Sequence, residues 1–202
     1  HSGQTGVQTT TVYPNQVTII DEISLQTVVQ FDHVAGIFLN NARSNANFIK
    51  SDVLVMDIDN DHSENPDEWM TVERLKEIFA DCNFALVTSR SHMQVKAGKV
   101  PRPKFHIYFQ INEVADKDIY VAMKEELCNQ YKFFDDNAKD AARFFFGNPQ
   151  AEVVWHDSWL TIDEDLFQAV SIDDEEDFDA EFYTPPSGPI QQGSRNSTMS
   201  VF

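Results

Sequence analysis

The distribution of apolar residues along the chain predicts alternating strands and helices. Residues 51–59 contain the unbroken apolar run Val53–Met56, which is typical of a central strand covered on both faces. Thr71 then opens a helix in which apolar residues recur at helical spacing, and residues 83–88 form the next strand. This strand–helix–strand order favours a βαβ crossover.

A different pattern follows in residues 105–111. There, apolar residues alternate with His106, Tyr108 and Gln110, which predicts a strand with a half-exposed polar face. Residues 116–131 fit an amphipathic helix. Its inward side chains are expected to be Ile119, Met123, Leu127 and, as a further candidate, Tyr120. Shorter strands are expected at residues 17–20, 35–39, 144–146 and 153–155, and shorter helices at 24–30 (capped by Ser24) and 163–170. These elements indicate an α/β (α+β) fold.

The composition favours one globular domain with a polar tail at each end. The chain has 202 residues, of which 42% are hydrophobic. Residues 1–16 are expected to be a flexible N-terminal arm that begins with the remnant of an expression tag. Residues 17–170 are expected to form the folded domain, and residues 171–202 an acidic and Pro/Gly-rich linker.

Charge is unevenly distributed along the chain. The formal net charge is −18, and seven of the nine residues 173–181 are acidic. In contrast, residues 90–106 contain five Lys or Arg residues and no acidic residue. This contrast indicates a local anion site rather than a broad basic surface for duplex nucleic acid. We also expect a cytoplasmic protein without membrane contact, because the chain has no long apolar run and its two cysteines read as core residues.

The first candidate for chemistry is Asp57-Ile58-Asp59 at the end of the apolar strand. Side chains two residues apart on a strand share a face, so both carboxylates project together. Neighbouring carboxylates repel each other unless a cation lies between them, and Mg²⁺ prefers such oxygen ligands together with substrate phosphates. The pair therefore indicates a site for a divalent cation.

The second candidate segment runs from Ser89 to His106 and is rich in hydroxyl and cationic groups. Ser89, Ser91 and Lys104 are well suited to bind the oxygens of a triphosphate. His106 opens the polar face of its strand and can donate to a phosphate, whereas His92 lies in the preceding loop. Either histidine can be the functional one on this pattern.

The third candidate segment follows the helix at 116–131. Asp135 or Asp136 lies just before a loop that leads into an aromatic strand, and a third carboxylate would complete a site for two metal ions. Arg143 near the end of this loop can neutralise Asp140 or contact a phosphate.

In this order the three segments resemble the motifs of the archaeo-eukaryotic primase superfamily. Those motifs are an apolar strand ending in Asp-x-Asp/Glu, a Ser-x-His-type segment whose histidine starts a strand, and an apolar residue followed by Asp. Residues 53–59 match the first motif, and residues 104–109 with Ser89 or Ser91 match the second. Phe134-Asp135 matches the third. The loop between Ser91 and His106 is longer than a compact Ser-x-His motif, which leaves the choice of histidine open.

The resemblance implies a fold and a mechanism. The fold would be an α/β unit packed on an RNA-recognition-like (RRM-like) unit, with the active site in the cleft between them. Asp57, Asp59 and Asp135 would hold two Mg²⁺ or Mn²⁺ ions for template-directed nucleotidyl transfer. His106, Lys104 and a serine would hold the triphosphate of the incoming nucleotide.

The match is closest to primase–helicase proteins of phages, plasmids and integrated elements. Their third motif often has the pattern seen from Asp135 to Arg143, and residues 193–199 look like the segment that precedes their helicase region. The resemblance implies that residues 17–170 are a primase–polymerase catalytic domain joined to a helicase region in a longer polypeptide. A single-stranded DNA template and nucleoside triphosphates would be its partners.

Two other functions fit parts of the pattern. A haloacid dehalogenase-like phosphatase also has an apolar strand ending in Asp-x-Asp, and Asp57 would then be a phosphoryl-accepting nucleophile. A catalytically inert replication-initiator or DNA-binding module would have kept the fold without the reaction. Intact carboxylates at Asp57, Asp59 and Asp135 disfavour an inert module, because such a module has no use for carboxylates that repel each other.

Overall fold

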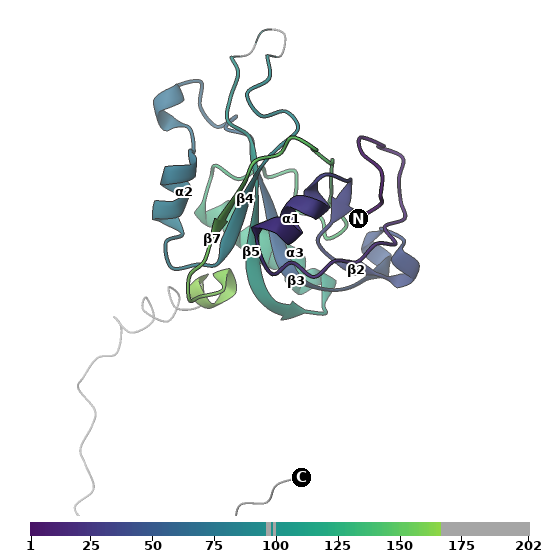
Figure 1. Ribbon diagram of the computed structural model, residues 1–202. Helices are drawn as coiled ribbons and strands as arrows, with labels where there is room; N and C mark the ends of the chain where they lie inside the picture. The colour runs from purple at the N-terminus through teal and green to yellow at the C-terminus, as the bar shows by residue number, and fades with distance from the viewer. Residues whose placement is uncertain (96–97, 99, 167–202) are drawn as a thin grey trace, which may run out of the picture.

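A five-stranded sheet forms the centre of the molecule. The structure is a computed structural model that describes residues 1–95, 98 and 100–166. The strands lie in the order β2-β3-β5-β4-β7, and every neighbouring pair is antiparallel (Figure 1). They are β2 (Ile37–Phe38), β3 (Phe48–Ile58), β4 (Phe84–Thr88), β5 (Phe105–Val114) and β7 (Val153–His156). The predicted linker 171–202, the end of the predicted helix 163–170 and the helicase-like segment lie outside the described residues.

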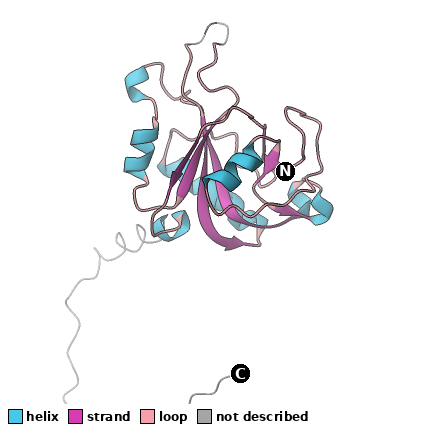
Figure 2. Cartoon of the chain, in the orientation of Figure 1, coloured by secondary structure: helices cyan, strands magenta, loops and turns pink. Residues whose placement is uncertain are grey.

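Helices and a small second sheet cover the two faces of this sheet. The helices are α1 (Glu22–Val29), α2 (Val72–Ile78) and α3 (Lys117–Gln130), with short 3₁₀ turns at Leu39–Asn41, Asn45–Asn47 and Pro66–Glu68. The second sheet pairs β1 (His33–Val34) with β6 (Phe144–Phe145). In the view of Figures 1 and 2, α1 lies in front of the sheet and α3 behind it. The expected mixed α and β structure is confirmed.

Strand β3 is buried on both faces, as its unbroken apolar run predicted. Leu54, Met56 and Ile58 pack with α2 and α3 in the larger core cluster. Val55 points to the opposite face, in a second cluster that contains residues of α1 and β6. Even-numbered side chains of this part of β3 therefore enter the larger cluster, and odd-numbered ones face the second cluster. By the same alternation, Asp57 lies on the face of the sheet that carries Val55.

The predicted βαβ crossover is present in a split form. Strands β3 and β4 run parallel to each other because each is antiparallel to β5, which lies between them. With α2 and α3 on one face, the order β3-α2-β4-β5-α3 is a split β-α-β arrangement. The candidate site therefore lies where β3 ends and the antiparallel β5 begins, rather than at the carboxyl edge of a parallel sheet.

Several predicted elements differ in their details. The first helix begins after Asp21, which caps it in a capping box with Ser24, so Ser24 is inside the helix and not its cap. Residues 17–20 form no strand, and only Ile37–Phe38 of the predicted strand 35–39 is extended and paired.

Helix α3 buries Leu127 and Tyr120 as predicted and packs Met123 against the core, but it leaves Ile119 exposed. Ile119 is 56% exposed, whereas Tyr120, Leu127 and Cys128 are buried. Lys124 is also fully buried, and this burial lowers the pKa of its amine to about 8, against the opposing effect of Asp57 and Asp140. The helix is rotated so that this amine, rather than Ile119, faces the interior.

The polar face of β5 is not half-exposed as predicted over its first part. Tyr108 is buried in the cluster that also contains Leu25, Val29 and Phe145, while Gln110 near the end of the strand is exposed. The prediction was wrong because an alternating sequence shows that a strand has two different faces but not which elements cover each face. Here α1 and β6 cover the face that carries Tyr108.

The N-terminal residues are packed against the rest of the molecule. Tyr13 is buried, its backbone N–H donates to the Asn41 carbonyl at 2.9 Å, and Val12 forms a β-bridge with Ala42. The side chain of Asp32 accepts hydrogen bonds from the backbone N–H groups of Gly6 and Val7. The expectation of a flexible arm over residues 1–16 does not agree with these contacts.

Two remaining expectations concern cysteines and membranes. Cys82 and Cys128 are unpaired and buried, in agreement with their interpretation as core residues. Among the residues that the structure describes, no helix has both the length and the apolar character needed to cross a membrane.

Candidate functional site

A cavity of about 340 Å³ lies where β3 ends and β5 begins. It brings together residues from four separate parts of the sequence. They are Gln8, Asp57, Asp59, Ser89, Arg90, Ser91, Lys104, His106, Asp135, Arg143, Phe144, Phe145 and Phe146. All eight residues predicted from the sequence to form the site are in this set.

Asp57 and Asp59 lie opposite the start of β5 and are already paired with cationic groups. Asp57 and His106 are directly opposite each other in the β3–β5 register, with 3.3 Å between Asp57 Oδ1 and His106 Nε2. Arg143 donates from Nη2 to Asp57 Oδ2 at 3.0 Å. Lys104 Nζ lies 2.9 Å from Asp59 Oδ2. The cations balance two carboxylates that would otherwise repel each other.

His106 rather than His92 lies in this cavity. Burial holds the pKa of His106 below its usual range, and the Asp57 and Asp59 carboxylates oppose that shift. The Nδ1 atom of His92 lies 3.2 Å from the backbone N of Lys104, and its ring packs on Phe105. Of the two histidines that the sequence left open, His106 is therefore the one that lines the cavity of the paired aspartates.

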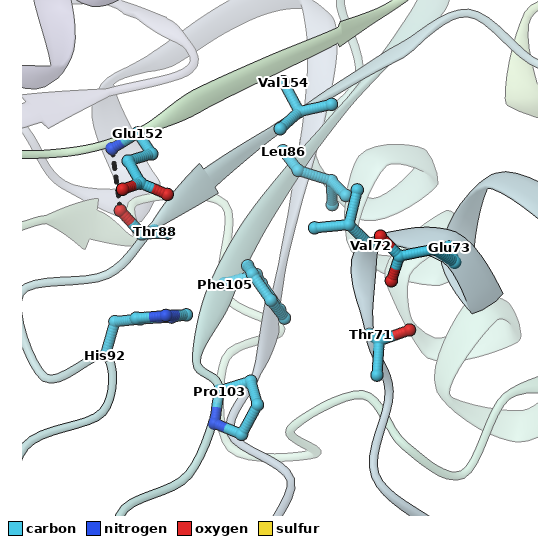
Figure 3. A pocket seen from close by; sticks show the side chains of 10 residues that line it. All are labelled: Thr71, Val72, Glu73, Leu86, Thr88, His92, Pro103, Phe105, Glu152 and Val154. Atoms are coloured by element: carbon cyan, nitrogen blue, oxygen red, sulfur yellow. Dashed lines mark hydrogen bonds between the residues drawn. The ribbon is translucent and has the colours of Figure 1, made fainter.

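His92 lines a second cavity, of about 220 Å³, on the opposite face of the sheet (Figure 3). Leu86, Phe105 and Val154 form its apolar part. The Thr88 hydroxyl there accepts a hydrogen bond from the backbone N–H of Glu152 at 2.8 Å. This cavity contains neither of the paired aspartates.

Asp135 rather than Asp136 faces the main cavity. The backbone N–H of Asp135 donates to the Asp57 carbonyl at 2.9 Å, which places the loop beside the end of β3. Its Oδ1 accepts from the backbone and side-chain amides of Asn137, both at 3.0 Å. Asp136 pairs instead with Lys139 at 2.8 Å outside the cavity.

The basic segment 90–106 does not act as one anion site. Arg102 is buried, donates to the Asn60 carbonyl and pairs with Asp61 and Glu64. Asn60 is also fully buried and binds the carbonyls of Met70 and Pro103 through its side chain. Arg102 therefore joins the loop after Asp59 to the segment before Lys104, and it holds the two sides of the site together.

Three parts of the cavity wall were not predicted from the sequence. Gln8 comes from the N-terminal segment that was interpreted as an arm, and Arg90 was noted only for its charge. Phe144 and Phe146 were interpreted as core strand residues, but they line the cavity and each stacks with an arginine. The unusual density of aromatic residues at 144–146 was the available signal.

The donor set of the cavity fits a divalent cation at Asp57 and Asp59. Oδ1 of Asp57 is buried and accepts no hydrogen bond, although His106 Nε2 lies 3.3 Å away, and a buried carboxylate oxygen in this state is well suited to bind a cation. Asp135 is not pre-arranged as a third ligand, because Asn137 binds its Oδ1. Within the described part of the chain, no group of three His, Cys, Asp or Glu side chains is arranged to hold a metal ion.

A buried histidine–tyrosine pair lies beneath the site. His33 Nδ1 is 2.7 Å from the Phe31 carbonyl, and Nε2 is 2.6 Å from the Tyr108 hydroxyl. The carbonyl can only accept, so the neutral ring donates from Nδ1 and accepts from Tyr108 at Nε2. Both residues contact Phe145, which also packs on His106.

This pair gives an expected pH dependence of stability. Burial lowers the pKa of His33 from 6.5 to about 4, so the unfolded chain binds the proton more readily between these values. The free energy of unfolding should therefore fall as the pH falls through this range, by about 2 kcal/mol between pH 7 and pH 5. Urea unfolding of wild type and His33→Gln at both pH values measures this decrease in the free energy of unfolding. The decrease should be smaller in the variant, because His33 no longer contributes to it. Equal pH dependence in both proteins would contradict the prediction.

Comparisons with known proteins give one structural similarity. No protein-family model matches the chain. No curated protein matches its sequence. The structure is similar to that of the archaeo-eukaryotic primase (AEP) domain of the primase–polymerase of cyanophage S-2L, with a TM-score of 0.46 and 14% sequence identity. The match covers 78% of this chain and 85% of the cyanophage domain.

Proposed function

We propose that this chain is a template-directed nucleotidyltransferase, a DNA primase or DNA polymerase of a mobile genetic element. The single observation that carries the proposal is the composition of the main cavity. Its carboxylate pair, with a buried oxygen that accepts no hydrogen bond, lies beside hydroxyl, amine, imidazole and guanidinium groups. Such a combination suits a metal-bound nucleoside triphosphate.

The residues of the cavity divide into two groups by their chemistry. Asp57 and Asp59, with Asp135 as a third candidate, would hold Mg²⁺ or Mn²⁺, and bound metal ions would supply charge stabilisation and activation of the attacking hydroxyl. Ser89, Ser91, Lys104 and His106 would bind and orient the triphosphate. Arg143, which now neutralises Asp57, would remain close enough to contact the same phosphates.

Transfer onto a template explains why the cavity also has an aromatic wall. Phe144 and Phe146 line the same cavity as the carboxylates; an arginine covers one face of each ring, and a base would stack on the other face. The order of the three motifs along the sequence supports a primase or polymerase over other nucleotide enzymes. A single-stranded DNA template and a helicase region in the same polypeptide belong to this proposal.

The test is an assay with a primed single-stranded template, labelled nucleoside triphosphates and either Mg²⁺ or Mn²⁺. We expect template-dependent extension that stops when EDTA removes the metal, and a parallel reaction without primer separates priming from extension. Release of inorganic phosphate without incorporation would instead support the phosphatase with Asp57 as nucleophile. Absence of any product, in this chain and in the longer polypeptide, would favour an inert DNA-binding module.

A further inference from the structure

Arg90 is a cation of the main cavity that forms no ion pair with a carboxylate among the described residues. Its guanidinium carbon lies over the Phe146 ring, 4.0 Å from the ring centroid, so the ring supports the group from one side. The other cavity cations, Lys104 and Arg143, are paired with Asp59 and Asp57. Over the residues that the structure describes, Arg90 has no such ion pair, although the chain carries a net charge of −18.

The N-terminal segment supports Arg90 from another side. A Cβ atom at Gly6 would lie 3.4 Å from Nη1 of Arg90, so the backbone of this segment passes directly against the guanidinium. Gly6 has a φ of +79°, a conformation that other residues adopt with strain. Gln8, two residues further on, reaches the cavity wall.

Asp32 connects both supports of Arg90. It is fully buried, and its carboxylate accepts three backbone N–H bonds: Gly6 at 2.8 Å, Val7 at 2.7 Å and Gly147 at 2.7 Å. Gly147 directly follows Phe146, so one carboxylate holds both the segment beside Arg90 and the ring beneath it. Hydrogen bonds to an ionised carboxylate are about twice as strong as neutral ones.

We propose that Arg90 binds a phosphate group in the main cavity and that Asp32 is the residue that positions it. The planar guanidinium matches two phosphate oxygens, and stacking on Phe146 restricts its rotation before a ligand binds. The phosphate belongs either to the triphosphate of the nucleotide or to the backbone of the single strand. This inference rests on the proposed function for the identity of the ligand.

Binding measurements test the role of Arg90 separately from catalysis. The probes are a fluorescent nucleoside triphosphate with Mg²⁺ and, separately, a labelled single-stranded oligonucleotide, and anisotropy gives Kd for each. Arg90→Gln should weaken the binding of one probe by about 10- to 100-fold, because a hydrogen bond to a charged group is lost. The affected probe identifies the source of the phosphate. Arg74→Gln makes the same charge change on helix α2, away from the cavity, and should leave both Kd values unchanged.

Each other outcome also has a clear meaning. If wild type binds a probe and Arg90→Gln binds it equally well, Arg90 has no role in phosphate binding and the proposed function is unaffected. If wild type binds neither probe, this inference and the proposed function fail together.

A double-mutant cycle tests the positioning role of Asp32. Asp32→Asn replaces one acceptor oxygen by an amide and should raise the same Kd as Arg90→Gln, yet add little in the Arg90→Gln background. A purely structural role would give equal effects in both backgrounds. Gly6→Ala leaves the carboxylate intact and should weaken binding in the same way, which keeps the test valid if Asp32→Asn does not fold. Wild-type affinity in both folded variants would overturn the positioning role.

Discussion

Replacing Asp57 with asparagine is expected to reduce template-directed nucleotide incorporation by about 1,000-fold or more, with the fold intact. The amide keeps the size of the side chain and its position opposite His106 but removes the negative charge that would bind the metal. Incorporation under saturating nucleotide and metal, compared between wild type and Asp57→Asn, measures the effect.

The same change should not weaken the protein itself. Asp57 lies at the end of β3 and Asp59 directly follows the strand, and Oδ1 of Asp57 is buried and accepts no hydrogen bond. Loss of one charge relieves the repulsion between the carboxylates but also removes the ion pair with Arg143, so the two effects oppose each other and the free energy of unfolding without divalent cations should change little. Wild type should gain thermal stability when Mg²⁺ or Mn²⁺ is added, and Asp57→Asn should gain less.

Strand β3 supplies a matched control. Asp52 lies on the same strand, is exposed and does not line the cavity, so Asp52→Asn makes the same chemical change away from the site. It should leave incorporation and the metal-induced stabilisation unchanged. Full activity of Asp57→Asn, or a phosphate group trapped covalently on Asp57 of the wild type, would refute the metal-ligand role.

Gly147→Ala is expected to destabilise the fold by about 3 kcal/mol or more, because overpacking against backbone cannot be relieved by turning a side chain. A Cβ atom at Gly147 would lie 2.5 Å from the Gln30 carbonyl oxygen and 2.6 to 2.7 Å from the backbone carbons of Phe31. The approach is this close because Asp32 binds the Gly147 N–H at 2.7 Å. Urea unfolding followed by far-UV circular dichroism measures the loss.

Gly3→Ala is the control for this substitution. Its Cβ would meet only the side-chain amide of Asn15, at 3.5 Å, so the cost there is the positive φ of Gly3 without a backbone clash. The loss should therefore be about 1 kcal/mol. Equal stability of Gly147→Ala and wild type would mean that Gln30–Asp32 and Gly147 are not packed together in solution.

The local pattern of the sequence by itself determined the main strands, the longer helices and the shared face of Asp57 and Asp59. These features depend on residues that are near each other in the chain. An unbroken apolar run identifies a strand buried on both sides, as β3 is. A period of two residues places two carboxylates on one face whatever lies around them. The helix cap at Thr71 is equally local and is present in α2.

Only the tertiary structure decided which side chains meet at the site. His106 and His92 lie on opposite faces of the sheet, and Arg102 forms a buried connection between two loops. Asp32 binds both Gly6 and Gly147, and Gly147 is 115 residues away from it in the sequence. The physical reason is that a buried polar group takes its hydrogen-bond partners from whichever groups the packed chain brings near it. Periodicity shows that a polar face exists, but the elements that cover it come from distant parts of the sequence.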